Sequence, residues 1–323
     1  MFKASVFFLC FVAILDAVNA RFLRSIRSHA EDGCPSMFVA VLSRKNETKT
    51  RSDIRKMWHS AGKAWGATVT AKFAVCRHAD EINAPSDKRL QEEVDKFGDV
   101  IEMNCTDKYD RGGLTHKVRD IMQVYVKEYM ATHPLFMKID DDTFISPAKL
   151  CDLLQENWTE LERFEGFQIY MGVFYEQPEW PSALSVPVRD PHSKWYEPHH
   201  VYSDKYYPYS AKGGPGYILS GKLVQQFLDL GIAKENMLWN EDKAVGVWVD
   251  KVKLQTGMMV EDVNVPGTDG YYFHKPFWQW HTMGNWSSFP YTLFHKLSSG
   301  TIKCLHELDA MGDPASMVDS CWQ

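Results

Sequence analysis

The first half of the chain alternates short apolar runs with segments whose apolar residues recur at helical spacing. Met37–Leu42 is a continuous apolar run, typical of a strand buried on both faces of a parallel sheet. Residues 50–59 place Ile54, Met57 and Trp58 on one face of a helix. This order predicts an α/β fold with a mainly parallel, doubly wound sheet and flanking helices. The other strands predicted here are Val69–Val75, Asp99–Met103 and Leu135–Ile139, and the other helices are Lys88–Phe97, Leu114–Met130 and one opened by Ser146-Pro147.

The second half is less regular. Residues 174–212 carry Pro, Trp, Tyr and His without clear periodicity, and a loop of this length inside a compact domain is usually functional. Helices are predicted near 221–230 and 241–253, whereas the last 60 residues are expected to be aromatic loops. No linker interrupts the pattern. We therefore expect a stem at residues 21–34, a single catalytic domain at 35–310 and a C-terminal tail at 311–323.

Residues 1–20 have the pattern of a targeting segment. A small positive start is followed by the apolar run Val6–Leu15, and Val18-Asn19-Ala20 fits a small-x-small cleavage site. The run is shorter than the roughly 20 residues that a spanning helix needs. Positive charges at 21, 24 and 27 also oppose an anchor with a lumenal C-terminus. These features favour a cleaved signal peptide, with a short type II anchor as the alternative.

Composition fits an exported chain. Hydrophobic residues make up 45% of it, enough for a sizeable core, and the net charge of −6 without a basic run argues against a nucleic-acid partner. Outside the N-terminal segment six cysteines allow up to three disulfides, and the sequence does not choose among fifteen pairings. The sequons predict N-glycosylation at Asn46, Asn104, Asn157 and Asn285.

Three consecutive carboxylates, Asp140-Asp141-Asp142, directly follow the predicted strand Leu135–Ile139. Like charges repel and raise one another's pKa, so the triplet brings no folding stability by itself. A divalent cation relieves the repulsion, since Mg²⁺ and Mn²⁺ prefer oxygen ligands. Ligands also bind at the carboxyl ends of strands in α/β sheets. We interpret the triplet as a metal site; a solvated Asp-rich turn that caps the next helix is the alternative.

A second acidic group, Glu241-Asp242, precedes the apolar stretch Ala244–Val249. Acids favour a helix N-terminus electrostatically, which is the structural explanation. The functional interpretation is a general base that takes a proton from an attacking hydroxyl, and spacing alone does not say which acid would be the base. Upstream, Gly213-Gly214-Pro215-Gly216 permits close approach of the backbone to a ligand, although such a cluster is more often a turn.

Several motifs stand in a fixed order over about residues 37–300, the most specific being Lys138–Phe144 (K-I-D-D-D-T-F). The others are Ile54-Arg55-Lys56-Met57-Trp58, Phe97–Ile101, Tyr109 with Leu114-Thr115-x-Lys117, Ser193–Tyr196, Tyr207–Tyr209 through Tyr217–Ser220, and Glu241–Gly246. Together they resemble the family of β1,3-galactosyltransferases and β1,3-N-acetylglucosaminyltransferases. No single motif is decisive, whereas the ordered set is specific.

The resemblance implies an inverting enzyme with a GT-A type nucleotide-diphospho-sugar transferase fold and a Rossmann-like sheet. It implies Mn²⁺ as cofactor, UDP-galactose or UDP-N-acetylglucosamine as donor, and a glycan or glycoprotein hydroxyl as acceptor in β1,3 linkage. By position, Asp142 binds the metal, Asp140 and Asp141 lie near the ribose and diphosphate with Asp140 also at the metal, Asp242 is the base, and Glu241 supports it.

Further site residues follow from the same resemblance. His295 ends a short apolar run and completes the metal shell, with His274 and His281 as alternatives. The residues expected to contact the donor are Arg55, Lys138, Asp140, Asp141, Gly214 and Gly216. Those expected to line the acceptor or donor pocket are Lys194, Trp195, Tyr207 and Tyr217. The family implies the Golgi lumen as location, with secretion as the alternative if the signal is cleaved.

Two departures from the family pattern leave alternatives open. Lys243 stands where the family usually has Val, and Pro215 removes a backbone N–H from the glycine motif. A catalytically inactive sugar- or nucleotide-binding relative is therefore the competing hypothesis. Arg21-Phe22-Leu23-Arg24 fits an R-x-L-R motif found after the signal peptides of some secreted proteins, which leaves a secreted effector without enzymatic role as the weakest of the three.

Overall fold

The central strand β1 (Met37–Ser43) has all seven residues buried. It pairs in parallel with β2 (Val69–His78) on one side and with β4 (Leu135–Asp140) on the other. Both of its faces are covered, which explains its continuous apolar sequence. Within the part of the chain that the structure describes, this sheet has seven strands in the order β3-β2-β1-β4-β7-β6-β8. The other strands are β3 (Val100–Thr106), β6 (Phe167–Gly172), β7 (Tyr217–Ser220) and β8 (Met259–Asn264).

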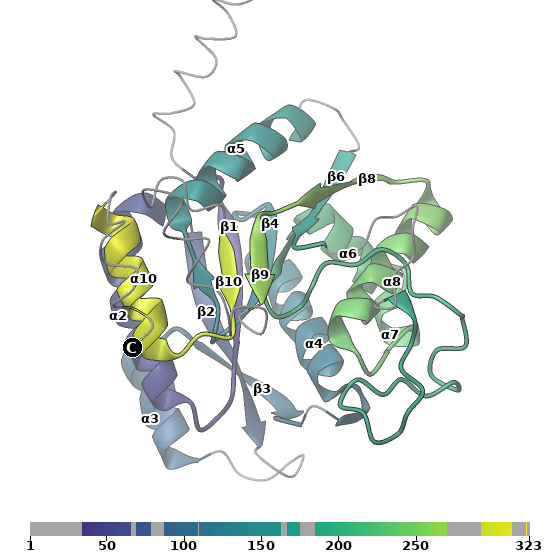
Figure 1. Ribbon diagram of the computed structural model, residues 1–323, viewed down its shortest axis with the longest axis horizontal. Coiled ribbons are helices and arrows are strands. Elements are labelled where there is room, and N and C mark those ends of the chain that lie inside the picture. The colour runs from purple at the N-terminus through teal and green to yellow at the C-terminus, as the bar shows by residue number, and fades with distance from the viewer. Residues whose placement is uncertain are drawn as a thin grey trace, which may run out of the picture.

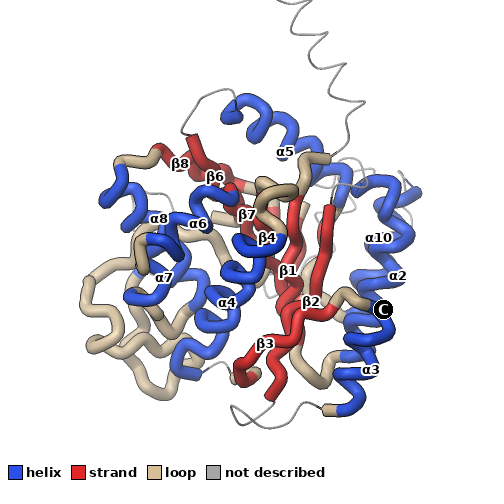
Figure 2. The backbone as a smooth tube through the Cα atoms, turned by 180° about the vertical axis from the view of Figure 1, so that it is seen from behind, coloured by secondary structure: helices blue, strands red, loops and turns tan. Residues whose placement is uncertain are grey.

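Helices cover both faces of this sheet, as Figures 1 and 2 show. One face carries α2 (Thr48–Trp65), α3 (Lys88–Phe97), α5 (Pro147–Glu162) and α10 (Ser299–Met311). The other carries α4 (Gly113–Glu128), α6 (Gly221–Asp229), α7 (Ile232–Glu235) and α8 (Glu241–Thr256). Each face buries its own apolar cluster, so the sheet is enclosed from both sides. The predicted α/β fold of the GT-A type, with a mainly parallel sheet, is confirmed.

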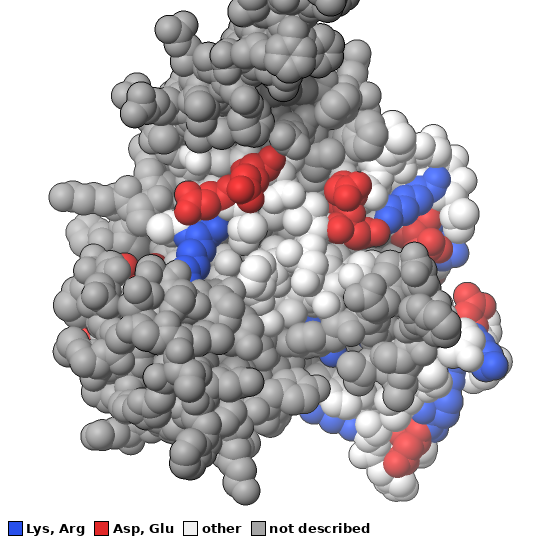
Figure 3. Space-filling model, turned by 45° about the horizontal axis from the view of Figure 1, so that its top comes forward, with Lys and Arg blue, Asp and Glu red and all other residues white. Residues whose placement is uncertain are grey.

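The computed structural model describes residues 34–65, 69–78, 87–108, 110–162, 167–174, 185–269, 292–311 and 321. The expected targeting segment, Tyr109, Asn285, His274 and His281 lie outside the described residues. Within them, no helix combines the length and apolar character that crossing a membrane requires. In the view of Figure 3, acidic and basic side chains lie close to one another on the described surface. This part of the face therefore does not carry a patch of one charge.

The sequence did not reveal that β7 is a strand. It lies antiparallel to both β4 and β6 and so interrupts the parallel order of the sheet. Four buried residues are too few to show a period, and they follow directly on the glycine motif. This insertion places the glycine loop beside the carboxyl end of β4, because the chain enters β7 opposite Lys138.

The expectation that the last 60 residues are loops was wrong. β9 (Gly267–Asp269), β10 (Leu293–His295) and β5 (Phe144–Ile145) form a second sheet of three short strands, and α10 packs against α2. Strands this short carry no period. The buried stripe of α10 consists of one apolar residue per turn at 302, 305 and 308, which is too sparse to stand out in the sequence.

Three disulfides join the six cysteines outside the N-terminal segment, which confirms the predicted maximum. Cys34 bonds to Cys151 on α5, across a sequence separation of 117 residues. Cys76–Cys105 links β2 to β3, and Cys304–Cys321 fixes part of the expected C-terminal tail to α10. Closing a loop of roughly 100 residues stabilises a fold by about 4–5 kcal/mol in the chain-entropy model, so the first bond constrains the chain most.

Candidate active site

A cavity of about 870 Å³ opens at the carboxyl ends of β1 and β4. The parts of the chain that line it include the end of β1, the aspartate triplet after β4, the glycine loop before β7, the first turn of α8 and the end of β10. This is the edge at which open α/β sheets bind ligands. The topology therefore brings both acidic groups and His295 to one cavity.

Asp140, Asp142 and His295 form the candidate metal site. One ligand atom from each lies within 4.8 Å of the others. His295 Nε2 is 3.1 Å from Asp142 Oδ1 and 3.6 Å from Asp140 Oδ2. Asp142 Oδ1 is buried and has no hydrogen-bond partner among the described residues. Two carboxylates and an imidazole suit a divalent first-row cation, so these residues fit one.

The pairing of β10 with β5 brings His295 to the triplet. β5 begins two residues after Asp142, and its Phe144 pairs with Phe294, the neighbour of His295. The turn after His295 is strained, because Lys296 has a φ of 63°, a left-handed conformation that side chains disfavour. Gly214 leaves space for the imidazole, since a Cβ there would lie 2.1 Å from the ring. Glycine is therefore required at 214 for the histidine to reach the site.

Lys138 connects the metal site to the second acidic group. Its side chain is buried, and its Nζ lies 2.8 Å from Asp140 Oδ1 and 3.4 Å from Glu241 Oε2. The same ammonium donates to the carbonyl of Gly213 at 2.8 Å. Burial raises the pKa of Asp141 to about 6, opposed by a hydrogen bond from Ser43. A bound cation would favour the charged form of this carboxyl.

The first turn of α8 presents Glu241 inward and Asp242 to the cavity. Glu241 is buried, accepts a hydrogen bond from the hydroxyl of Tyr217, and packs against Gly213, where a Cβ would lie 2.6 Å from its Oε2. Burial raises the pKa of Glu241, whereas the charge of Lys138 lowers it. Asp242 is half-buried and lines the cavity. Both acids line the cavity, and Asp242 is the more exposed of the pair.

The two departures from the family pattern have clear positions. Lys243 donates to Ser210 Oγ at 3.0 Å, and its Nζ lies 5.6 Å from the centre of the Tyr207 ring. It lines the cavity. Next to Pro215, the carbonyl of Gly214 accepts a hydrogen bond from Thr143 at 2.9 Å, so this loop is tied to the triplet by an acceptor that proline does not remove.

Four apolar side chains that line the cavity form what we call the apolar wall. Val186, Val188 and Trp195 come from the long irregular loop, and Trp239 comes from the segment just before α8. Trp195 is 54% exposed, and Lys194 places its Nζ 4.8 Å from the Trp195 ring centre. Exposed apolar side chains gathered in one cavity mark a surface that a ligand covers. The predicted residues Lys194, Trp195 and Tyr207 therefore lie at the cavity.

Three predicted site residues lie elsewhere. Arg55 does not line the cavity; it binds Asp99 at 2.7 Å and Glu93 at 2.8 Å and joins α2 to α3. Gly216, with a φ of 104°, packs against the backbone of Lys138, and Tyr217 lies behind Glu241 rather than at the cavity surface. Arginine in the I-R-x-x-W motif is thus explained by ion pairing, and Gly216 by close strand packing.

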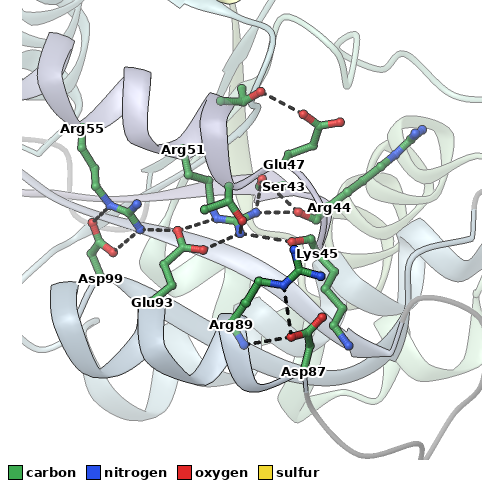
Figure 4. A network of polar contacts seen from close by, with 12 residues as sticks. Ser43, Arg44, Lys45, Glu47, Arg51, Arg55, Asp87, Arg89, Glu93 and Asp99 are labelled. Atoms are coloured by element: carbon green, nitrogen blue, oxygen red, sulfur yellow. Dashed lines mark hydrogen bonds and ion pairs between the residues drawn. The ribbon is translucent and has the colours of Figure 1, made fainter.

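Sequence reasoning missed the Arg51 network, which consists of Ser43, Arg44, Lys45, Arg51 and Glu93 and is drawn in Figure 4. The Arg51 guanidinium is fully buried, binds both oxygens of Glu93, and donates to the carbonyls of Arg44 and Lys45. The network fixes the loop after β1, which contributes Ser43, Arg44 and Glu47 to the cavity. Arg51 stands three residues before Ile54 and seven before Trp58, on the apolar face of its helix, so helical spacing was the signal that could have marked it as buried.

Lys117 also lines the cavity, although the motif that contains it, Leu114-Thr115-x-Lys117, predicted no role for it. Its buried Nζ donates to the carbonyl of Ser43 at 2.8 Å and to Asp107 Oδ1 at 3.0 Å. Burial lowers the pKa of Lys117, opposed by the charge of Asp107. The residue ties the ends of β1 and β3 together at the cavity floor.

The predicted glycosylation sites differ in exposure. Asn46 and Asn104 are exposed, as a glycan requires. Asn157 is half-buried on α5, and its Nδ2 donates to the carbonyl of Leu153 at 2.7 Å. A glycan on Asn157 would compete with that hydrogen bond.

Comparisons with known proteins agree on one family. A family model described as galactosyltransferase matches residues 49–260. Hydroxyproline O-galactosyltransferase GALT2 of Arabidopsis thaliana is 29% identical over 67% of this chain and 28% of its own length. Beta-1,3-galactosyltransferase 1 of Mus musculus is 26% identical over 72% and 65%. UDP-GalNAc:beta-1,3-N-acetylgalactosaminyltransferase 1 of Mus spicilegus is 26% identical over 78% and 69%.

The aligned region covers less than two thirds of the first two of these relatives. The family model, in contrast, extends over more than half of the present chain, from α2 to the start of β8. It includes the aspartate triplet, the glycine loop and both acids of α8. The chain therefore belongs to the galactosyltransferase family.

Proposed function

We propose that this protein is an inverting hexosyltransferase that moves galactose or a related N-acetylhexosamine from a UDP-sugar to a hydroxyl of a glycan or glycoprotein in β1,3 linkage. The observation that carries the proposal is the meeting of two acidic groups with separate environments in one cavity. Asp140, Asp142 and His295 form a cation site, whereas Asp242 stands apart from it on α8. Sugar transfer requires one group for each side of the reacting carbon.

Asp140, Asp142 and His295 would hold the metal, and we propose Mn²⁺ as the ion. A divalent cation bound there neutralises charge that develops on a leaving diphosphate. The Arg51 network and Lys117 shape the loop after β1 that borders this part of the cavity. We therefore assign the nucleotide to the region between the triplet and the end of β1.

Asp242 is the proposed general base. Its carboxylate takes the proton of the acceptor hydroxyl while the acceptor oxygen bonds to the anomeric carbon and the bond from that carbon to the diphosphate breaks. Attack from the side opposite the leaving group inverts the configuration. Glu241 is a positioning residue, since it is buried and held by Tyr217 and Lys138. The apolar wall, with Trp195 exposed, is the proposed surface for the apolar face of the acceptor sugar.

The donor is tested directly. Purified protein with Mn²⁺ is offered UDP-galactose, UDP-N-acetylglucosamine and UDP-N-acetylgalactosamine, and release of UDP is measured. We expect one donor to dominate and EDTA to abolish release. UDP-galactose is the first choice because two of the relatives are galactosyltransferases by name, and UDP-N-acetylgalactosamine is added because the third names it. Binding of UDP without turnover of any donor would instead favour the inactive relative.

The cellular setting is also a proposal. The cysteine pairing and the exposed Asn46 and Asn104 support a route through the secretory pathway, with the Golgi lumen as the site of action. Digestion of the secreted or lumenal protein with an N-glycosidase tests it. A mass loss for glycans at Asn46 and Asn104 is expected, and an unchanged mass would contradict the assignment.

A further inference from the structure

Glu197 is a fully buried carboxylate on the irregular loop, and the function proposed above gives it no role. Its Oε1 accepts a hydrogen bond from the backbone N–H of Trp239 at 3.0 Å. Its Oε2 accepts from the backbone N–H of Asn240 at 3.1 Å, from Asn240 Nδ2 at 2.9 Å and from the hydroxyl of Tyr207 at 3.3 Å. A buried carboxylate needs such donors, and every one of these is uncharged.

Two of the donors immediately precede the catalytic pair of α8. Trp239 and Asn240 are followed directly by Glu241 and Asp242. The backbone that enters α8 is therefore held by a side chain from a different loop. Asn240 is also the N-cap residue of α8, and its own side chain makes no capping hydrogen bond. The carboxylate of Glu197 accepts from the N–H groups of the two residues just ahead of the first turn, so it fixes the chain where it enters the helix.

The same contact fixes the apolar wall. Trp195 lies two residues before Glu197, and its carbonyl accepts a hydrogen bond from Asn240 Nδ2 at 3.2 Å. Tyr196 packs edge-on against the Trp239 ring, with centroids 5.5 Å apart. The wall and the base are thus joined by Glu197 and its nearest neighbours.

Arg189 gives Glu197 a firm attachment within its own loop. Its guanidinium donates to the carbonyl of Glu197 at 2.6 Å and to the carbonyl of Tyr202 at 2.8 Å. The N–H of Glu197 in turn donates to the carbonyl of Val188 at 2.8 Å. Residues 185–212 contain no helix or named strand, so these bonds take the place of regular structure in this stretch. A shift of Glu197 would therefore move the wall and not only the side chain.

We infer that Glu197 is a positioning residue that sets the apolar wall at a fixed distance from Asp242, and so aligns an acceptor sugar on the wall with the base. The coupling of the wall to Asp242 follows from the contacts described above, whereas the alignment of an acceptor sugar rests on the proposed function. Water needs no such alignment, because it reaches Asp242 without binding the wall. Loss of Glu197 should therefore impair transfer to a sugar more than hydrolysis of the donor.

The test uses Glu197→Gln, which keeps the size of the side chain. The amide has one acceptor oxygen and a donor nitrogen, so at least one buried N–H loses its acceptor. UDP release is measured in water alone and with p-nitrophenyl β-galactoside or p-nitrophenyl β-N-acetylglucosaminide as acceptor probe. We expect the ratio of transfer to hydrolysis to fall by about tenfold to a hundredfold, the scale of a misplacement near 1 Å. UDP affinity should stay at the wild-type value.

Hydrogen exchange on the same variant tests the cause without any turnover. Backbone amides of residues 185–212 and of 239–243 should exchange faster together, while those of β1 and β2 stay protected. If the wild type releases no UDP, the proposed function has failed, and this measurement still decides whether Glu197 couples the two segments. Glu102→Gln is the matched control, because Glu102 pairs with Arg77 at 2.7 Å outside the cavity.

Three results would overturn the inference. Transfer and hydrolysis could fall in proportion, which would reduce Glu197 to a stabilising residue. The variant could transfer sugar at the wild-type ratio. Exchange could rise in the loop and not at the start of α8, which would show that the carboxylate does not join them.

Discussion

The cavity has two sides that are built from different chemistry. On the side of β1 the buried carboxylate Glu93 is held by two arginines, Arg51 at 2.6 Å and Arg55 at 2.8 Å. On the side of the apolar wall, the partners of the buried carboxylate Glu197 among the described residues are backbone N–H groups, an amide and a phenol. The first side rests on regular strands and helices, and the second on a loop. Rigidity therefore comes from ion pairs between two helices that cover the sheet on one side, and from neutral hydrogen bonds on the other.

This difference bears on what each side binds. A diphosphate with a cation brings strong charge, which fixed ion pairs and the triplet are suited to meet. An acceptor sugar is neutral and needs an apolar face with a few polar contacts. A loop can also vary in sequence without disturbing the sheet, since connecting segments tolerate change. We expect donor chemistry to be set by the first side and acceptor choice by the second.

The largest expected effect is on the rate of sugar transfer, and it distinguishes the proposed base Asp242 from the proposed metal ligand Asp142. Asp242→Asn should lower the transfer rate by about 10²–10⁴-fold, the usual contribution of a general base, with UDP and Mn²⁺ binding retained. Asp142→Ala should abolish metal-dependent UDP binding itself. Calorimetric titration with UDP and Mn²⁺, alongside UDP release, distinguishes them. Full activity of the Asp242 variant would show that another group is the base.

The next effect concerns the ion-paired side. Arg51→Met should lower the free energy of unfolding by about 3–5 kcal/mol, because it leaves Glu93 buried with one partner fewer. Denaturant unfolding measures it. Arg77→Met is the matched control, since Arg77 is 44% exposed and its pair with Glu102 is worth less than about 1 kcal/mol. Equal losses in the two variants would mean that burial does not decide the difference.

A third prediction concerns α10 and the pH dependence of the free energy of unfolding. Burial lowers the pKa of His306 from 6.5 to about 4, and its ring packs edge-on against Phe144. The unfolded chain then binds more protons between these values, so stability falls as pH drops from about 6.5 toward 4. The loss approaches roughly 3 kcal/mol. His306→Phe should flatten this part of the pH profile of unfolding, and an unchanged slope would contradict the assignment.

The smallest expected effect concerns the uncharged hydrogen bonds that hold Glu197. Tyr207→Phe removes only the longest of the four contacts to Glu197, at 3.3 Å, and leaves the ring beside Lys243. We expect a loss of about 1 kcal/mol in stability and a transfer-to-hydrolysis ratio only a few-fold below the wild type. Thermal unfolding and the UDP-release assay measure the two quantities. A drop as large as that of Glu197→Gln would show that the hydroxyl, and not the backbone contacts, carries the coupling.

The two sides also differ in how far the sequence predicts them. β1, β2, β4 and the triplet follow from continuous apolar runs and a motif that directly ends a strand. The Arg51–Glu93 pair joins residues 42 positions apart and the Glu197–Asn240 contact joins residues 43 apart, and no local pattern specifies such partners. Arg55 was predicted to contact the nucleotide because of its place in a motif. A motif does not specify which partner a residue contacts, and Arg55 pairs with Glu93 and Asp99. β7, β9 and β10 are too short to show a period.

His295 and Asp142 stand nearly half the chain apart, and the pairing of β10 with β5 brings them together, supported by a hydrogen bond of 3.0 Å from the N–H of Leu297 to the carbonyl of Asp142. A ribosome makes the triplet long before it makes the histidine. The nascent polypeptide can close the parallel strands of β1, β2 and β4 while its metal shell still lacks one member. A cation held by all three residues would have to wait until β10 has been made, and a chain that ends before β10 would carry the triplet without its histidine.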